Sequence, residues 1–308
     1  MRTLPYLLSS FIIVFVSIIS GCKQGASTSK DNTSTTADTT QPNHMQDTAA
    51  LKKGYSEVNG IKMYYEMYGK GSPLVLIHGG GSTIQTTFGR ILPLLSQHRN
   101  VIAVELQAHG HTSDRDTPLS FSQDASDVVT LLKNLNIPKA DLLGFSNGAQ
   151  TAMQIAISYP AMVNKLIMAS GFYKREGVPA GFWNGIQHAQ FSEMPQALKD
   201  DYMKINNDSA KLLNMFHRDV VRMQTFKDWS DNDVKSITAP TLLIIGDKDV
   251  PTPEHAVAMH HLIPHSRLAI IPGAHGQYLG EITTLDKGKW NEPYVADLFE
   301  QFLKTENF

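Results

Sequence analysis

Gly144-Phe145-Ser146-Asn147-Gly148 is the most informative segment of this chain for its fold. It follows the partly apolar run Ala140-Asp141-Leu142-Leu143 and precedes a segment with the composition of a helix. A serine hydroxyl is a weak nucleophile unless a base reaches it, so it must be held out at the tip of a tight turn. Side chains two residues before and two residues after that serine would collide across the turn, which accounts for the two glycines. The pattern predicts a strand, a sharp turn that carries Ser146, and a helix.

The rest of the chain alternates short apolar runs with segments of helical period. Asn59-Gly60 joins two alternating segments and predicts a β-hairpin. Apolar runs typical of buried parallel strands occupy residues 73–78, 100–104, 142–143, 165–168, 241–245 and 268–271, and segments of helical period include 123–135 and 253–262. This alternation predicts an α/β fold, with a mostly parallel central sheet, helices on both faces and the hairpin as an antiparallel edge.

One interval, residues 172–237, interrupts the alternation. It contains no buried strand pattern, and aromatic and methionine side chains are scattered among polar residues. An interval of this length is too long for a simple connection. We therefore expect a helical lid insert within a folded domain that spans residues 51–308.

The N-terminal segment has the features of an export signal. Met1-Arg2 carries positive charge, and an apolar run from Leu7 to Ile19 is too short to span a membrane comfortably. The run ends in Ile19-Ser20-Gly21-Cys22, which resembles the lipobox of bacterial lipoproteins. The resemblance implies a signal peptide at residues 1–21, acylation of Cys22, for instance with palmitate, and anchoring to a membrane of the bacterial cell envelope. An ordinary secretory signal with an incidental cysteine is the alternative.

Composition limits the partners that this protein can have. The chain has 308 residues, a formal net charge of −2 and 42% hydrophobic residues, which suits a globular domain and gives no reason to expect nucleic acid as a partner. Cys22 is the only cysteine, so the chain forms no internal disulfide. Residues 22–50 are rich in Ser, Thr, Asp and Gln and predict a flexible tether.

Reactive residue types follow several of the predicted strands. His78-Gly79-Gly80-Gly81, Ser146, the segment Gly246-Asp247-Lys248-Asp249, and His275 each come just after an apolar run. Because the carboxyl ends of parallel strands meet at one edge of a sheet, we expect these residues to lie close together. A nucleophile, an acid and a base then converge, with Asp247 and Asp249 both available as the acid.

Over about residues 54–305 this arrangement resembles the α/β-hydrolase superfamily with a Ser-Asp-His triad. The resemblance implies that Ser146 is the nucleophile and that His275 acts first as general base and then as general acid. It also implies that Asp249, the fourth residue of a G-x-x-D turn, orients the histidine. Asp247 is then a turn residue that accepts hydrogen bonds from backbone amides.

The developing oxyanion of such a reaction needs two backbone N–H donors. The amide of Asn147 is one candidate, because it lies at the start of the helix after the nucleophile. By the same resemblance the residue after His-Gly supplies the other, which points to Gly80, with Gly81 in reserve. His78 is expected to brace this glycine loop.

The segment Glu105-Leu106-Gln107-Ala108-His109-Gly110-His111 departs from the pattern of the superfamily. Glu105 stands where relatives commonly have aspartate, and Ala108 replaces a usual glycine. His109 and His111 suggest a metal pair, but no third ligand lies at a suitable spacing. We predict neither a metal nor a cofactor.

These features predict a two-step acyl transfer to water, the hydrolysis of a small-molecule carboxylic ester. An acyltransferase of the same fold is an alternative. A C–C bond or amide hydrolase is another, although Ser82-Thr83 replace the proline that such relatives usually carry in the glycine-rich loop. A ligand-binding or sensor lipoprotein with slow turnover is the alternative from a different class.

Overall fold

The computed structural model describes residues 50–287 and 292–306. The predicted signal peptide, Cys22 and all but the last residue of the predicted tether lie outside the described residues. Within the described part of the chain, no helix is both long enough and apolar enough to cross a membrane.

An eight-stranded sheet in the order β1-β2-β4-β3-β5-β6-β7-β8 forms the centre of the domain. The strands are β1 (Lys52–Val58), β2 (Ile61–Tyr68), β3 (Pro73–Ile77), β4 (Asn100–Val104), β5 (Ala140–Phe145), β6 (Val163–Ala169), β7 (Thr241–Lys248) and β8 (Ser266–Ala274). All pairings from β4 to β8 are parallel, whereas β1 pairs with β2 and β2 with β4 in antiparallel fashion. The predicted α/β fold with an antiparallel hairpin edge is confirmed.

The hairpin turn has the backbone that its sequence requires. Asn59 and Gly60 have φ of 45° and 87°, the left-handed values of a two-residue type I′ turn. The short turn sets the register so that Val58 pairs with Ile61.

Helices cover both faces of the sheet, and alternate strand residues face each layer. Val75 and Ile77 of β3 contribute to one core cluster, whereas Leu74 and Leu76 contribute to the other. The first cluster includes side chains of α3 (Phe121–Asn134), α4 (Asn147–Ser158), α8 (Asp231–Lys235) and α9 (Pro253–Leu262). The second includes side chains of α1 (Ile84–Phe88), α2 (Leu92–Leu95) and α10 (Glu292–Lys304).

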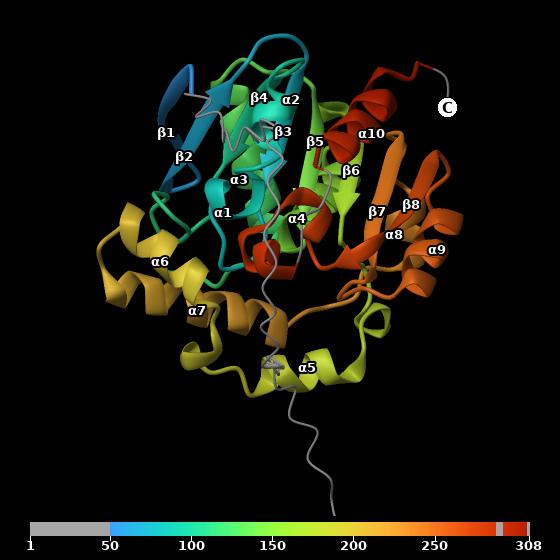
Figure 1. Cartoon of the computed structure of the whole chain (residues 1–308). Helices are drawn as coiled ribbons and strands as arrows, with labels where there is room; N and C mark the ends of the chain where they lie inside the picture. Colours follow the sequence, from blue (N-terminus) through green and yellow to red (C-terminus); the bar gives the residue numbers. More distant parts are fainter. Residues whose placement is uncertain (1–49, 288–291, 307–308) are drawn as a thin grey trace, which may run out of the picture. The chain divides into compact units, whose positions relative to one another are not determined.

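Between β6 and β7 the described chain forms helices and no strand. The helices α5 (Ala180–Gln187), α6 (Gln196–Ile205) and α7 (Ser209–Gln224) lie together beyond one end of the sheet, at the bottom of Figure 1. The last part of the predicted lid differs from this arrangement, because Val234 of α8 and Ile237 are buried in the main core cluster. The segment 231–237 therefore packs in a core layer, as Tyr173 at the start of the interval also does, and we use "lid" for residues 174–230.

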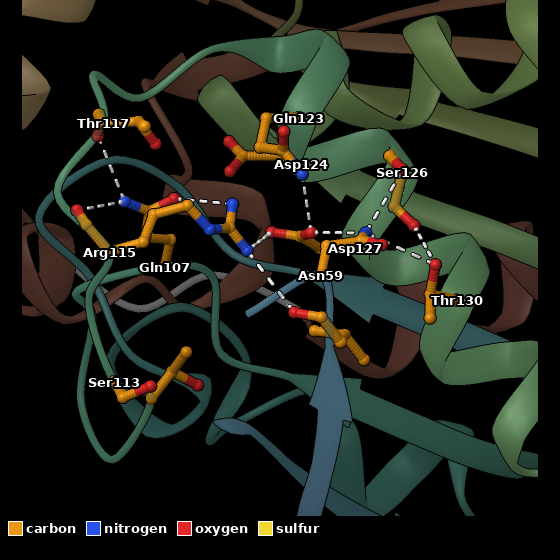
Figure 2. A network of polar contacts seen from close by, with 12 residues as sticks. Asn59, Gln107, Ser113, Arg115, Thr117, Gln123, Asp124, Ser126, Asp127 and Thr130 are labelled. Carbon is orange, nitrogen blue, oxygen red and sulfur yellow. Dashed lines mark hydrogen bonds and ion pairs between the residues drawn. The ribbon is translucent and has the colours of Figure 1, made fainter. Parts of the chain in front are cut away.

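A buried ion pair attaches the loop after β4 to α3 (Figure 2). Arg115 donates to Asp127 at 2.7 Å and to the side-chain oxygen of Gln107 at 2.8 Å. Asp127, which has no exposed surface, also accepts from Asn59 of the hairpin turn and Gln123 of α3, each at 2.8 Å. The contacts connect three parts of the chain that are distant in sequence, and they hold the loop that carries His109.

Replacing Asp127 by Ala should lower the free energy of unfolding by about 3 kcal/mol, because it leaves the Arg115 guanidinium largely buried without its carboxylate. Urea unfolding of the purified domain measures this loss. Asp116→Ala, at an exposed acid in the same loop, is the matched control. A loss for Asp127→Ala no larger than the loss for Asp116→Ala would contradict the role assigned to this ion pair.

Candidate active site

Ser146 lies at a strained turn between β5 and α4. Its backbone has φ of 52° and ψ of −123°, a region that non-glycine residues rarely occupy. A Cβ at Gly144 would come within 2.1 Å of the Gly148 carbonyl oxygen, and a Cβ at Gly148 within 2.1 Å of the Ile77 carbonyl oxygen. Both positions therefore require glycine, as the sequence pattern predicts, and the turn presents Ser146 at the carboxyl edge of the sheet.

The structure brings Ser146, His275 and Asp249 into one chain of hydrogen bonds. His275 Nδ1 lies 2.5 Å from Asp249 Oδ1, and His275 Nε2 lies 3.0 Å from Ser146 Oγ. Because an ionised carboxylate only accepts, Nδ1 carries the proton, which leaves Nε2 free to accept from the serine hydroxyl. This is the geometry in which histidine can act as a general base on serine.

Asp249 accepts hydrogen bonds from three further groups in addition to its contact with His275. Its Oδ2 accepts from Ser170 Oγ at 2.6 Å and from the Gly246 amide at 2.9 Å, and its Oδ1 accepts from the Val250 amide at 2.7 Å. The Tyr278 hydroxyl lies 2.7 Å from Ser170 Oγ. Burial alone would raise the pKa of Asp249, but His275 and these hydrogen bonds outweigh it and hold the pKa below its usual range.

Asp247, the alternative acid, points elsewhere. Its Oδ1 accepts from the Gly273 amide at 2.8 Å, so it satisfies a backbone amide as expected. It lies within β7 rather than in a turn, because the pairing of β7 with β8 continues past Gly246 with a shift of register.

The glycine loop and the start of α4 adjoin at Ser146. Asn147 is the first residue of α4, so its N–H has no acceptor within the helix. A Cβ at Gly80 would lie 2.4 Å from Asn147 Nδ2, which shows how closely the two segments approach. The Gly81 amide, by contrast, donates to Asp219 of the lid at 2.5 Å. The reserve donor is therefore already engaged, and Gly80 and Asn147 are left as the pair of candidate donors.

The three histidines near this loop have separate environments. His78 donates from Nδ1 to the Gly79 carbonyl at 2.7 Å and accepts from the Leu106 amide at 3.0 Å, so it is neutral and braces the loop. Burial lowers the pKa of His78 to about 3. His109 contacts Asp219 at 2.9 Å, whereas His111 contacts Glu105 at 2.9 Å.

His109 and His111 thus have different carboxylate partners. In residues 50–287 and 292–306, no group of three or more His, Cys, Asp or Glu side chains is arranged to hold a metal ion.

A cavity of about 350 Å³ opens at Ser146 and extends beneath the lid. Its lining is mainly apolar and includes Phe172, Phe182, Ile186, Leu198, Phe216 and Met223. Of the described residues that line it, none is lysine or arginine, and the two carboxylates are those of Glu193 and Asp219. The cavity therefore suits an uncharged apolar group next to the serine.

Two residues of this site were missed by sequence reasoning. Ser170 has φ of 55° and follows β6 directly, so its position at a strand end was a usable signal. Asp219 lies in the middle of a lid helix, 110 positions after its partner His109, and no local pattern marks it.

Comparisons with known proteins agree with this geometry. The model of the alpha/beta hydrolase family matches residues 74–279. Serine hydrolase BPHL of Homo sapiens is 30% identical over 239 residues, which cover 72% of this chain and 79% of that protein. The 2-hydroxy-6-oxo-6-(2'-aminophenyl)hexa-2,4-dienoic acid hydrolase of Metapseudomonas resinovorans is 23% identical, over 73% of this chain and 84% of that protein.

Among solved structures, CarC, a serine hydrolase involved in carbazole degradation, is similar with a TM-score of 0.66 at 21% identity. The similarity covers 82% of this chain and 98% of CarC, and supports the fold. The family model matches more than half of the chain, and the relatives are hydrolases. The chain is therefore an enzyme that belongs to the alpha/beta hydrolase family.

Proposed function

We propose that this enzyme is a serine hydrolase that cleaves an uncharged carboxylic ester through an acyl-enzyme on Ser146. The observation that carries the proposal is the 3.0 Å contact of Ser146 Oγ with the acceptor nitrogen of His275, two residues that line a mainly apolar cavity. The candidate N–H donors of Gly80 and Asn147 line the same cavity.

The reaction starts when Ser146 Oγ forms a bond to the ester carbonyl carbon and its proton passes to His275 Nε2. The carbonyl oxygen becomes an anion that accepts from the amides of Gly80 and Asn147. The intermediate collapses, the bond to the alcohol oxygen breaks, and His275 returns the proton to the alcohol. Water then repeats the sequence, giving up one proton to His275, and the carboxylic acid leaves as Ser146 is restored.

Asp249 has two effects in this scheme. It keeps the proton of His275 on Nδ1, so that Nε2 faces the serine, and it stabilises the imidazolium that forms in each half-reaction. Because the Asp249 pKa is held below its usual range, this carboxyl group stays ionised at neutral pH.

The lining of the cavity supports an uncharged ester over the carboxylate substrate named for the relative from Metapseudomonas resinovorans. A dienoic acid is an anion at neutral pH, and its burial without a paired cation is costly. Among the described residues of the cavity, lysine and arginine are absent, and the carboxylate of Glu193 would repel an anion. Ser82-Thr83, in place of the proline common in C–C bond hydrolases, agrees with this choice.

Paired chromogenic esters test the substrate class. We expect hydrolysis of p-nitrophenyl butyrate with a kcat/KM at least about 100-fold above that for p-nitrophenyl hemisuccinate, since the second acyl group ends in a carboxylate that the cavity leaves unpaired. Ser146→Ala supplies the background rate for each ester. Equal kcat/KM values for the two esters, or cleavage of both by Ser146→Ala at the wild-type rate, would contradict the proposal.

The two acids after Gly246 allow a matched test of the triad. Asp249→Asn should lower kcat by about 10³–10⁴-fold, because the amide favours the wrong tautomer of His275. Asp247→Asn should stay within about fivefold of wild type, since its side-chain oxygen can still accept from the Gly273 amide. Steady-state kinetics on p-nitrophenyl butyrate measures both variants. A loss for Asp247→Asn as large as that for Asp249→Asn would exclude Asp249 as the orienting acid.

The lipid anchor at Cys22 is a separate proposal, supported by the lipobox resemblance alone. In a bacterial host, the full-length chain should incorporate a palmitate analogue and sediment with membranes, because acyl chains buried in a bilayer provide the attachment. Cys22→Ser should abolish both. Labelling of the Cys22→Ser chain at the level of the unchanged chain would show that this cysteine is not the acceptor.

A further inference from the structure

Asp219 of the lid helix α7 reaches across the site to the glycine loop of the core. Its Oδ2 accepts the Gly81 amide at 2.5 Å. The same oxygen would lie 3.2 Å from a Cβ placed on Gly80, so the carboxylate lies against the residue that supplies a candidate oxyanion donor. The proposed mechanism assigns Asp219 no step, although it lines the cavity together with Ser146 and His275.

The carboxylate lies between two cationic groups. Arg222, one turn further along α7, donates to Asp219 Oδ1 and also to Asp124 of α3 at 2.7 Å. His109 lies with Nε2 at 2.9 Å from Asp219 and Nδ1 at 2.8 Å from the Gln107 carbonyl. Both neighbours of this ring only accept, so both ring nitrogens carry protons and His109 is an imidazolium.

The directions in which the pKa values of His109 and Asp219 are shifted agree with these charges. Burial opposes ionisation of both groups, but the carboxylate of Asp219 outweighs it and raises the pKa of His109 above its usual value. Arg222 and His109 together hold the pKa of Asp219 well below its usual range. The Gly81 amide also lies 3.2 Å from His109 Nε2, but a protonated nitrogen does not accept, so the shorter contact with Asp219 is the hydrogen bond.

This contact bears on catalysis because three consecutive glycines form the loop. Residues 79–81 lack side chains that would limit their backbone angles, and glycine is the least restricted residue. The bond from the Gly81 N–H to Asp219 orients the peptide between Gly80 and Gly81. The N–H of Gly80 lies in the preceding peptide, whose carbonyl, that of Gly79, accepts from His78 Nδ1 at 2.7 Å. The two hydrogen bonds hold the peptides on either side of Gly80 and together fix where its N–H points.

We propose that Asp219 is a positioning residue that orients the Gly80–Gly81 peptide, so that the oxyanion hole is complete only when α7 is seated on the core. The inference rests on the proposed Ser146 chemistry and adds a dependence of that chemistry on the lid. His109 and Arg222 neutralise the carboxylate, so that it orients the loop without placing an uncompensated negative charge beside the developing oxyanion.

A purely structural role for Asp219 would be to dock α7, and the same helix offers a control for that role. Arg218 pairs with Asp114 at 2.6 Å and donates to the Thr117 carbonyl at 2.6 Å. Arg218 therefore holds α7 against the loop after β4 through contacts that do not involve Gly81. Loss of lid docking in general would appear in Arg218→Ala as well as in Asp219 variants.

The test compares Asp219→Ala, Asp219→Asn and Arg218→Ala with wild type on p-nitrophenyl butyrate. We expect kcat to fall about 100-fold in Asp219→Ala, near the loss of one oxyanion donor. In Asp219→Asn it should fall about 10-fold, because the amide oxygen can still accept from Gly81. KM should stay within about threefold in both, since the effect is on the transition state. Arg218→Ala should keep kcat within about threefold.

A second measurement, the rate at which a fluorophosphonate modifies Ser146, requires no substrate. It should fall in the same order, because the phosphoryl oxygen occupies the oxyanion hole. If wild type is labelled but cleaves no ester, the proposed function fails, while the labelling rates still test Asp219. Should Asp219→Ala not fold, Asp219→Asn carries the comparison. A kcat and labelling rate of the folded Asp219 variants within twofold of wild type, a change confined to KM, or an equal fall in Arg218→Ala would overturn the proposal.

Discussion

The close contact between the turn at Ser146 and the end of β3 is the constraint on which the site depends. Gly148 lies against the carbonyl oxygen of Ile77 so tightly that a methyl group does not fit. This contact places the start of α4 beside the glycine loop, and the left-handed backbone of Ser146 then turns its side chain toward His275. Such strain persists only where the surrounding structure enforces it, and here β5, α4 and β3 do so together.

Two buried carboxylates, one from the core and one from the lid, support the site. Asp249 comes from a strand end of the core and orients His275, while Asp219 comes from the lid and contacts the glycine loop. Each accepts several hydrogen bonds and faces a cationic group or a histidine, so each is fixed in direction. A buried carboxylate with all its partners is a rigid support, whereas one that lost a partner would be strongly destabilising.

The fold, and the site residues that directly follow predicted strands, could be predicted from the sequence. The strand pattern and Asn59-Gly60 predicted the sheet and its edge, and the position of Ser146, Asp249 and His275 after apolar runs placed them at one edge. The resemblance pointed to Gly80 with Gly81 in reserve, and the structure adds an observation that no local pattern contains, because the Gly81 amide donates to a lid side chain 138 positions away. The predicted lid runs to residue 237, whereas the short helix α8 packs its single valine, which is buried, into the core.

His109 shows why the sequence does not predict residues whose partners come from distant parts of the chain. Its neighbour His111 suggested a metal pair, yet the two rings contact carboxylates from different parts of the chain. Charge pairs between a lid helix and a core loop follow from tertiary packing, which periodicity and spacing do not describe.

Locating the adduct that a fluorophosphonate forms on the purified protein tests most directly whether Ser146 is the nucleophile. Trypsin should release residues 140–165 as one peptide, which contains both Ser146 and Ser158. Tandem mass spectrometry should place a single modification on Ser146, and protein with Ser146→Ala should remain unmodified. An adduct on any other residue, or no adduct on the folded protein, would contradict the assignment of Ser146 as the nucleophile.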